Sequence, residues 1–361
     1  MKNSIAFLIA CLVFVSCFQP SEEKPIVSVQ EYFNYGDTGL RSGGVRLIPI
    51  QTPVGEFKVW TKRFGNNPRI KVLLLHGGPG GTHEVMESFE SFFPQENFEF
   101  YEYDQLGSYY SDKPTDSSLW TNDRFVEEVE QVRQALGMNK DNFILYGQSW
   151  GGILALDYAL KYQDNLKALV ISNMMSSAPD YDKYSEVLAK QMDPQVVDTI
   201  KAMETRGATT DPKYMDLLYK NFYNFHLCRV PVWPDAVNRA FAHMNSEIYV
   251  MMQGPSEFGI SGRLENWDVK SRLKEIRVPT LVIGATYDTM DPEHMKWMST
   301  QVQKGRFLLC PEGSHLSMWD DQKHFFPGLI SFIHDVDNGK FYRLSSYSIS
   351  DSCFFWWKPK R

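Results

Sequence analysis

The chain has 361 residues, of which 43% are hydrophobic and 14% aromatic, and its formal net charge is −7. This length exceeds that of one minimal domain and suits one large α/β domain that carries an insertion. A negative net charge without a long basic run argues against nucleic acid or anionic lipid as the main partner.

The first 17 residues have the pattern of an export signal. Lys2 precedes the apolar run Ile5–Val15, which at roughly ten residues is shorter than the ~20 needed to span a bilayer. The run ends in Ser16-Cys17, which resembles a bacterial lipoprotein cleavage box. We therefore predict a signal peptide over residues 1–17, lipidation at Cys17, and an exported protein that is periplasmic or membrane-anchored. Plain secretion with cleavage nearby and an uncleaved anchor are the alternatives.

After a predicted linker and N-terminal segment (residues 18–44), strand-like and helix-like segments alternate. Apolar residues at helical spacing predict helices over 123–136 and 152–162. Such alternation predicts an α/β fold with a mostly parallel central sheet and helices on both faces. The predicted strands are 57–61, 70–75, 98–103, 143–146, 168–172, 280–283 and 306–309.

The pattern changes over residues 173–272, which are helical in character and rich in Met and Tyr. We predict that they form a helical cap, inserted between two parts of the core at 45–172 and 273–336. No function is assigned to the aromatic and basic tail at 337–361. The cysteines show neither zinc-site spacing nor the density of a disulfide scaffold, and Cys310, at the end of an apolar run, is expected to be a buried thiol.

A nucleophile motif follows the fourth predicted strand. Residues 147–151 read Gly-Gln-Ser-Trp-Gly, and they lie between a strand and a helix, the context that a G-x-S-x-G turn requires. Glycines on either side of the serine let the strand and helix pack closely, while the serine hydroxyl projects above the sheet. Ser149 is therefore the predicted nucleophile.

A serine nucleophile needs a base and an acid that orients the base. Asp288 follows one predicted strand and His315 follows the next, so the order Ser149, Asp288, His315 is the Ser–acid–His order expected of this fold. The remaining histidines lie in the cap, in helical stretches or near the first loop, and His76 is expected to shape the loop that follows it. Asp291 is the alternative acid, although Pro292 after it predicts a helix cap instead.

The motif HGGPG at 76–80 follows a buried strand. Glycine costs backbone entropy, so such a cluster indicates a tight turn or a backbone that approaches a ligand. In α/β-hydrolases one oxyanion donor is the N–H of the residue after the nucleophile, and the other comes from an early loop of this kind. The predicted donors are therefore Trp150 and Gly78, with Gly77 as the neighbouring alternative.

Taken together, these motifs resemble the proline iminopeptidases of the α/β-hydrolase superfamily (peptidase family S33), including the tricorn-interacting aminopeptidases. The resemblance spans about residues 45–336. Two positions differ from the family pattern: Leu106 stands where the family has arginine, and Thr289 follows the acid where some members have glutamate. The matching segments are HGGPG at 76–80, Asp-Gln-Leu-Gly at 104–107, Ser-Asp at 111–112, GQSWGG at 147–152, GPSEF at 254–258 and GSHL at 313–316.

The resemblance implies release of an N-terminal residue, proline or another small or hydrophobic residue, from short peptides, without a metal or cofactor. It also places an amine-binding glutamate in the GPSEF motif, here Glu257. Glu204 is a second candidate because of its position in the cap. An esterase or amidase of the same fold that needs no free amine is the alternative function, and a catalytically silent binding protein is a third.

Overall fold

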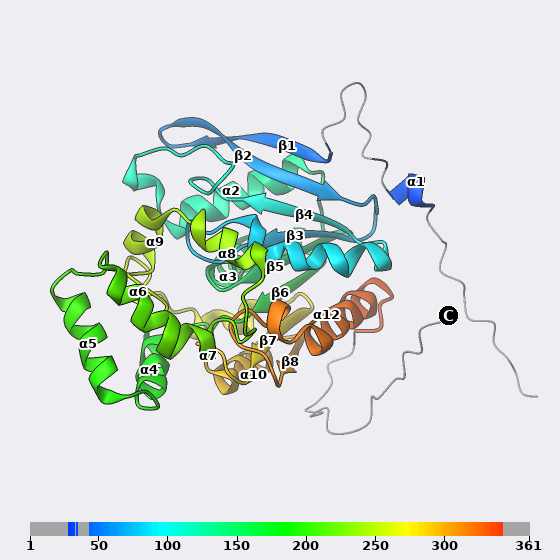
Figure 1. The fold of residues 1–361 in the computed structure, drawn as a ribbon. Helices are drawn as coiled ribbons and strands as arrows, with labels where there is room; N and C mark the ends of the chain where they lie inside the picture. The colour runs from blue at the N-terminus through cyan, green and yellow to red at the C-terminus, as the bar shows by residue number, and fades with distance from the viewer. Residues whose placement is uncertain (1–27, 33, 35–42, 342–361) are drawn as a thin grey trace, which may run out of the picture.

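The computed structural model describes residues 28–32, 34 and 43–341 (Figure 1). The predictions for the signal peptide, for Cys17 and for most of the C-terminal tail concern residues outside these ranges. Before the main fold lies one short helix, α1 (Val29–Tyr32). In the described part of the chain, no helix is both long and apolar enough to cross a membrane.

A single eight-stranded sheet forms the centre of the molecule, in the order β1-β2-β4-β3-β5-β6-β7-β8. The first two strands pair antiparallel with their neighbours, and all other pairs are parallel. The mostly parallel α/β sheet predicted from the sequence is therefore confirmed. The strands are β1 (Val45–Thr52), β2 (Gly55–Phe64), β3 (Lys71–Leu75), β4 (Glu99–Asp104), β5 (Phe143–Gln148), β6 (Ala168–Ser172), β7 (Thr280–Ala285) and β8 (Gly305–Cys310).

Strand β1 was not among the predicted strands. It lies at the edge of the sheet and pairs with β2 alone. Ile48 and Ile50 are buried on one side of it, whereas Leu47 is 51% exposed on the other. Pro49 lies inside this strand at an exposed position, and proline inside a strand is tolerated mainly at sheet edges, where the missing N–H is not needed by a second neighbour.

Helices cover both faces of the sheet, as predicted. One face packs against α2 (Asn122–Ala135), α3 (Trp150–Tyr162) and α10 (Pro292–Gln301). The other packs against α12 (Gln322–Asp337) and an aromatic cluster around Phe89. Short helical turns complete the core: η1 (His83–Ser91), η2 (Phe93–Glu96), η3 (Ser117–Leu119), η4 (Gln163–Asn165), η6 (Lys270–Glu275) and α11 (Ser317–Asp320).

The segment between β6 and β7 forms a group of helices beside the sheet (Figure 1). Several of these helices share a buried cluster of their own, which includes Ile200 and Phe222. Arg239 joins the group to the core through ion pairs with Glu84 and Glu87 of η1. The elements are α4 (Ala178–Ala189), α5 (Pro194–Thr205), α6 (Pro212–Leu218), the π-helical turn η5 (Tyr219–Tyr223), α7 (Asn224–His226), α8 (Asp235–Ala242) and α9 (Ser246–Met252).

Candidate active site

Ser149 occupies a sharp turn between β5 and α3. Its backbone has φ 55° and ψ −125°, a strained conformation for a residue with a side chain. A Cβ atom on Gly147 would collide with the carbonyl of Gly151, and one on Gly151 would collide with the carbonyl of Leu75. The glycines of the motif are thus required by the close packing of strand, helix and neighbouring strand around the serine.

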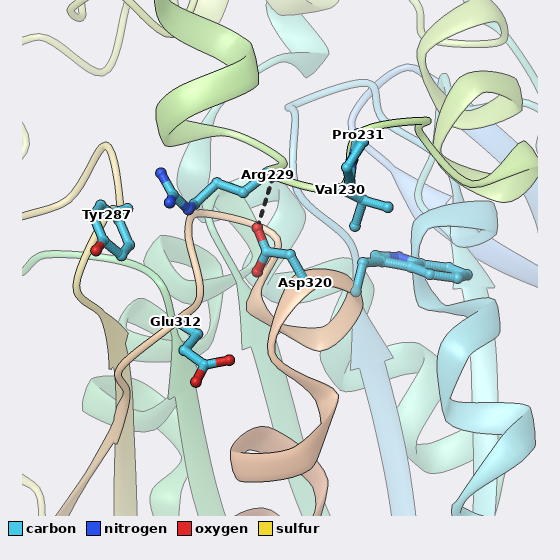
Figure 2. Close-up of a pocket in the computed structure, with 7 residues that line it drawn as sticks. Arg229, Val230, Pro231, Tyr287, Glu312 and Asp320 are labelled. Carbon is cyan, nitrogen blue, oxygen red and sulfur yellow. Dashed lines mark hydrogen bonds between the residues drawn. The ribbon is translucent and has the colours of Figure 1, made fainter.

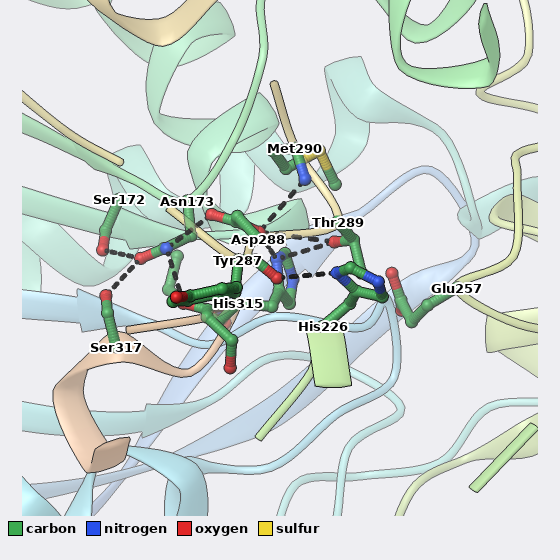
Figure 3. Close-up of polar contacts among 12 residues, drawn as sticks. Ser172, Asn173, His226, Glu257, Tyr287, Asp288, Thr289, Met290, His315 and Ser317 are labelled. Atoms are coloured by element: carbon green, nitrogen blue, oxygen red, sulfur yellow. Dashed lines mark hydrogen bonds and ion pairs between the residues drawn. The ribbon is translucent and has the colours of Figure 1, made fainter. Parts of the chain in front are cut away.

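The ends of the next strands bring an acid and a base together. Asp288 follows β7 and His315 follows β8, and both side chains are buried. Asp288 Oδ1 lies 2.8 Å from Nδ1 of His315 (Figure 3), and it also accepts a hydrogen bond from the backbone N–H of Met290 at 3.1 Å. With Nδ1 protonated and bound to the acid, Nε2 of His315 is the nitrogen that can accept a proton.

The environment of His315 favours its charged form. Burial of the ring disfavours the imidazolium, but the charge and hydrogen bond of Asp288 more than offset this, with further contributions from Glu257 and Asp320. The net effect raises the pKa of His315. Such a histidine is stabilised as an imidazolium after it has taken a proton from a nucleophile.

Asn173 connects the acid to the loop of the base, a role that was not predicted from the sequence. Its amide nitrogen donates to Oδ2 of Asp288 at 2.6 Å and to the carbonyl of Ser314 at 3.1 Å. The hydroxyls of Ser172 and Ser317 donate to its amide oxygen at 2.8 and 2.9 Å, which fixes the orientation of the amide (Figure 3). No motif marks this residue, and only the meeting of β6, β7 and β8 at one sheet edge makes it significant.

The HGGPG loop lies directly against the nucleophile turn. A Cβ atom built on Gly77 would be 2.6 Å from Oε1 of Gln148 and 3.1 Å from Cβ of Ser149. Gly78 has φ 119°, a conformation that favours glycine. Side chains are therefore disfavoured at Gly77 and Gly78, and the backbone at Gly77 lies next to Ser149.

His76 shapes this loop, as predicted. Burial lowers its pKa, so the ring is neutral: Nδ1 donates to the carbonyl of Gly77 at 2.7 Å, and Nε2 accepts from the N–H of Gln105 at 3.2 Å. Gln105 Oε1 accepts from the indole N–H of Trp150 at 2.8 Å. The two segments that carry the predicted oxyanion donors are therefore connected through one glutamine.

The two candidate amine-binding glutamates have different surroundings. Glu257 is buried, accepts a hydrogen bond from the hydroxyl of Tyr249 at 2.6 Å, and contributes to the electrostatic field at His315. Glu204, at the end of α5, accepts from the hydroxyl of Tyr214 at 2.6 Å, and burial raises its pKa. Glu257 is therefore the one whose charge acts on the predicted base.

The structure also shows the roles of Asp291, the alternative acid, and of Cys310, the predicted buried thiol. Asp291 caps α10, since its carboxylate accepts from the N–H of Glu293 at 2.9 Å. Cys310 is a free, fully buried cysteine. Both observations agree with the sequence-based interpretation.

A pocket of about 440 Å³ is lined in part by Tyr287 and Glu312, from the loops that follow β7 and β8, and by Asp320 of α11 (Figure 2). Asp320 forms part of its wall and accepts hydrogen bonds from Ser314, next to the base, and from the N–H of Arg229. The guanidinium of Arg229 stacks on the ring of Tyr287, which precedes the acid. The pocket is therefore lined by residues that contact the loops carrying Asp288 and His315. Its lining residues are Arg229, Val230, Pro231, Tyr287, Glu312, Trp319 and Asp320.

Comparison with known proteins gives a consistent result. The family model described as the alpha/beta hydrolase fold matches residues 71–322. A proline iminopeptidase of Flavobacterium johnsoniae is 66% identical over 295 residues, covering 81% of this chain and 99% of that protein. One from Elizabethkingia meningoseptica is 63% identical over 82% of this chain and all of its own. The crystal structure of a Mycobacterium smegmatis proline iminopeptidase superposes with a TM-score of 0.73 at 27% identity, over 82% of this chain and 99% of its own.

Proposed function

The chain belongs to the proline iminopeptidases of the α/β hydrolase fold, and on this basis we propose that it is a serine exopeptidase. It releases one N-terminal residue, proline or another small or hydrophobic residue, from short peptides. The observation that carries this proposal is the buried contact of 2.8 Å between Asp288 Oδ1 and Nδ1 of His315. The same structure holds Ser149 in a strained turn next to the glycine loop.

The first half of the reaction forms an acyl-enzyme. His315 takes the proton of the Ser149 hydroxyl as its oxygen attacks the carbonyl carbon of the N-terminal residue. Asp288 orients the imidazole and stabilises the imidazolium. The backbone N–H groups of Trp150 and of Gly78 or Gly77 donate to the oxyanion, an interaction that strengthens in the transition state.

Collapse of the tetrahedral intermediate breaks the peptide bond. His315 returns its proton to the leaving amine, so that the shortened peptide departs and the first residue remains esterified to Ser149. Water then attacks this ester with His315 as base, and the free amino acid and the serine hydroxyl are regenerated.

Release of a single N-terminal residue requires recognition of the free amine, which is largely cationic near neutral pH. A buried carboxylate is a suitable partner because charge-assisted hydrogen bonds are short and strong. Glu257 fits this role since it is buried and its charge acts on His315.

A substrate panel tests the proposal. The substrates are the naphthylamides of proline, alanine and leucine, their N-acetylated forms, and a short-chain ester that lacks an amine. We expect hydrolysis of the free-amine amides and little turnover of the acetylated ones. Equal rates on both would instead identify an esterase or amidase that needs no free amine.

Two matched substitutions identify the amine receptor. Breaking one side of a buried ion pair typically costs about 3–5 kcal/mol, so Glu257→Gln should reduce kcat/KM on free-amine substrates by roughly two orders of magnitude or more. The ester should be affected only slightly. Glu204→Gln should leave both substrates near the wild-type rate, and a larger loss in this variant would move the receptor to Glu204.

We further propose that residues 1–17 direct export and that Cys17 carries a lipid anchor, which makes the mature enzyme periplasmic or membrane-attached. The support is the charge of Lys2, the short apolar run at 5–15 and the small residue before Cys17.

A further inference from the structure

The hydroxyl of Thr289 lies beside the contact between the acid and the base (Figure 3). Thr289 directly follows Asp288 in the loop after β7, its side chain is fully buried, and its Oγ1 lies 3.0 Å from Nδ1 of His315. We propose that Thr289 is a positioning residue for His315, because its hydroxyl is a second acceptor for the Nδ1 proton and helps Asp288 to hold the productive tautomer. This inference rests on the proposed serine hydrolase mechanism.

Nδ1 of His315 carries one proton and has two oxygen neighbours. Oδ1 of Asp288 is the nearer at 2.8 Å, and Oγ1 of Thr289 follows at 3.0 Å; both distances lie in the usual range for an N–H···O hydrogen bond. The proton can therefore be shared between a carboxylate and a hydroxyl in a three-centre hydrogen bond. Because both acceptors face Nδ1, each of them favours the tautomer that leaves Nε2 free to take a proton.

The hydrogen of the Thr289 hydroxyl is directed toward the acid. Oγ1 donates to Oδ1 of Asp288 at 3.4 Å, and in the described part of the chain no side chain other than those of Asp288 and His315 hydrogen-bonds to this hydroxyl. The lone pairs of Oγ1 are therefore available to the proton on Nδ1. A neutral hydroxyl also supplies this acceptor without a second negative charge next to Asp288, which would disfavour ionisation of the acid.

The hydrogen bonds around Asp288 make the role of Thr289 measurable. The amide nitrogen of Asn173 donates to Oδ2 at 2.6 Å, and the N–H of Met290 donates to Oδ1 at 3.1 Å. In Asp288→Asn, one of these donors must face the NH₂ group of the new amide. If that group takes the place of Oδ1, it donates to Nδ1 and favours the wrong tautomer. The Thr289 hydroxyl is then the remaining acceptor that favours the productive one.

The chain offers a matched control for Thr289. Thr280, the first residue of β7, is also fully buried, and its hydroxyl donates to the carbonyl of Val278 at 3.0 Å. Thr289→Val and Thr280→Val therefore each remove one buried hydroxyl and keep the branched shape of the side chain. They differ in whether the lost oxygen contacts His315.

The first part of the test uses single variants. A neutral acceptor that shares its proton with a carboxylate contributes modestly, so Thr289→Val should lower kcat about threefold with KM little changed. The loss should be similar for prolyl-naphthylamide and for a short-chain neutral ester, because His315 serves both reactions. Thr289→Ser keeps the hydroxyl and should turn over near the wild-type rate.

The second part repeats the substitutions in the Asp288→Asn background. Here Thr289→Val should lower kcat by about 30-fold, because the hydroxyl is the remaining acceptor for the Nδ1 proton. Such a loss is measurable, since removal of the acid alone typically leaves a serine protease roughly 10²-fold more active than removal of the whole triad. Thr280→Val should change kcat little in either background. The excess loss at Thr289 is a coupling between two residues that contact the same nitrogen.

Other results would separate the possible errors. Equal factors of loss for Thr289→Val in the two backgrounds, or equal losses for folded Thr289→Val and Thr289→Ser, would assign the effect to packing and overturn the proposal. If Thr289→Val does not fold, Thr289→Cys, which has a weak acceptor in place of the hydroxyl, must show the same coupling, and its absence also overturns the proposal. A wild-type enzyme that hydrolyses N-acetylprolyl-naphthylamide as fast as the free amine would contradict the exopeptidase function, while the coupling measured on the ester would still decide the role of Thr289.

Discussion

The amide nitrogen of Asn173 donates to Oδ2 of Asp288 at 2.6 Å, while Oδ1 of the same carboxylate contacts His315 at 2.8 Å. Asn173 also holds the carbonyl of Ser314, the residue before the base. One side chain at the end of β6 thus positions both the predicted acid and the loop of the predicted base.

The first prediction concerns this residue. Asn173 has φ 53°, so Asn173→Gly removes the amide without backbone strain. Loss of a hydrogen bond to a buried charge costs ~1.5–3 kcal/mol, so kcat should fall about 10- to 100-fold with KM little changed. Steady-state kinetics measure this. Ser317→Ala, which removes a hydrogen bond to the amide oxygen and keeps both bonds from the amide nitrogen, should lose much less. Equal losses in the two variants would refute the positioning role.

The two candidate acids are separated by the same substitution at each position. Asp288→Asn should lower kcat by about 10⁴-fold, because the imidazole loses the partner that fixes its tautomer. Asp291→Asn should retain nearly full activity, because asparagine caps a helix about as well as aspartate. Reversed magnitudes in the kinetic assay would transfer the catalytic role to Asp291.

The pH dependence follows from the raised pKa of His315. The base must be neutral to take a proton, so the acid limb of kcat/KM should lie above the ordinary histidine value of about 6.5. The charge of Glu257 contributes to this elevation, so Glu257→Gln should lower the pKa and move the limb of ester hydrolysis to lower pH. Glu204→Gln should leave the limb in place. An unchanged or higher limb in Glu257→Gln would contradict the assigned electrostatics.

The proposed lipid anchor predicts a location. The expressed protein should fractionate with membranes and be released by detergent, whereas Cys17→Ala should release it into the soluble fraction or block its processing. Immunoblotting of the fractions decides this. A wild-type protein found entirely in the soluble fraction would end the lipoprotein proposal.

Much of the architecture was predictable because its signals are local. The apolar runs that became β3, β5, β6 and β7 are buried on both faces, and their polar neighbours mark where each strand ends. A G-x-S-x-G turn between strand and helix is specified by steric requirements that the sequence displays directly. The contact between Asp288 and His315 follows because adjacent parallel strands end at the same edge of the sheet.

The remaining features depend on contacts between distant segments. Strand β1 is half exposed and contains Pro49, a residue that disfavours a strand prediction, so its local pattern is weak. Asn173 and Tyr249 belong to no motif. From the sequence alone, an asparagine at position 173 is typical of a turn and a tyrosine at position 249 is typical of a packed core. Their significance appears only in the folded structure, where three strand ends meet at the carboxylate of Asp288 and the hydroxyl of Tyr249 reaches the carboxylate of Glu257.

The most direct measurement is the turnover of prolyl-naphthylamide by the purified wild-type protein and by Ser149→Ala. The variant keeps the backbone turn but lacks the attacking oxygen, so it should unfold at a temperature close to wild type and lose about 10⁴-fold or more of kcat. A folded Ser149→Ala protein that retains wild-type turnover would contradict the assignment of Ser149 as the nucleophile and, with it, the serine exopeptidase mechanism.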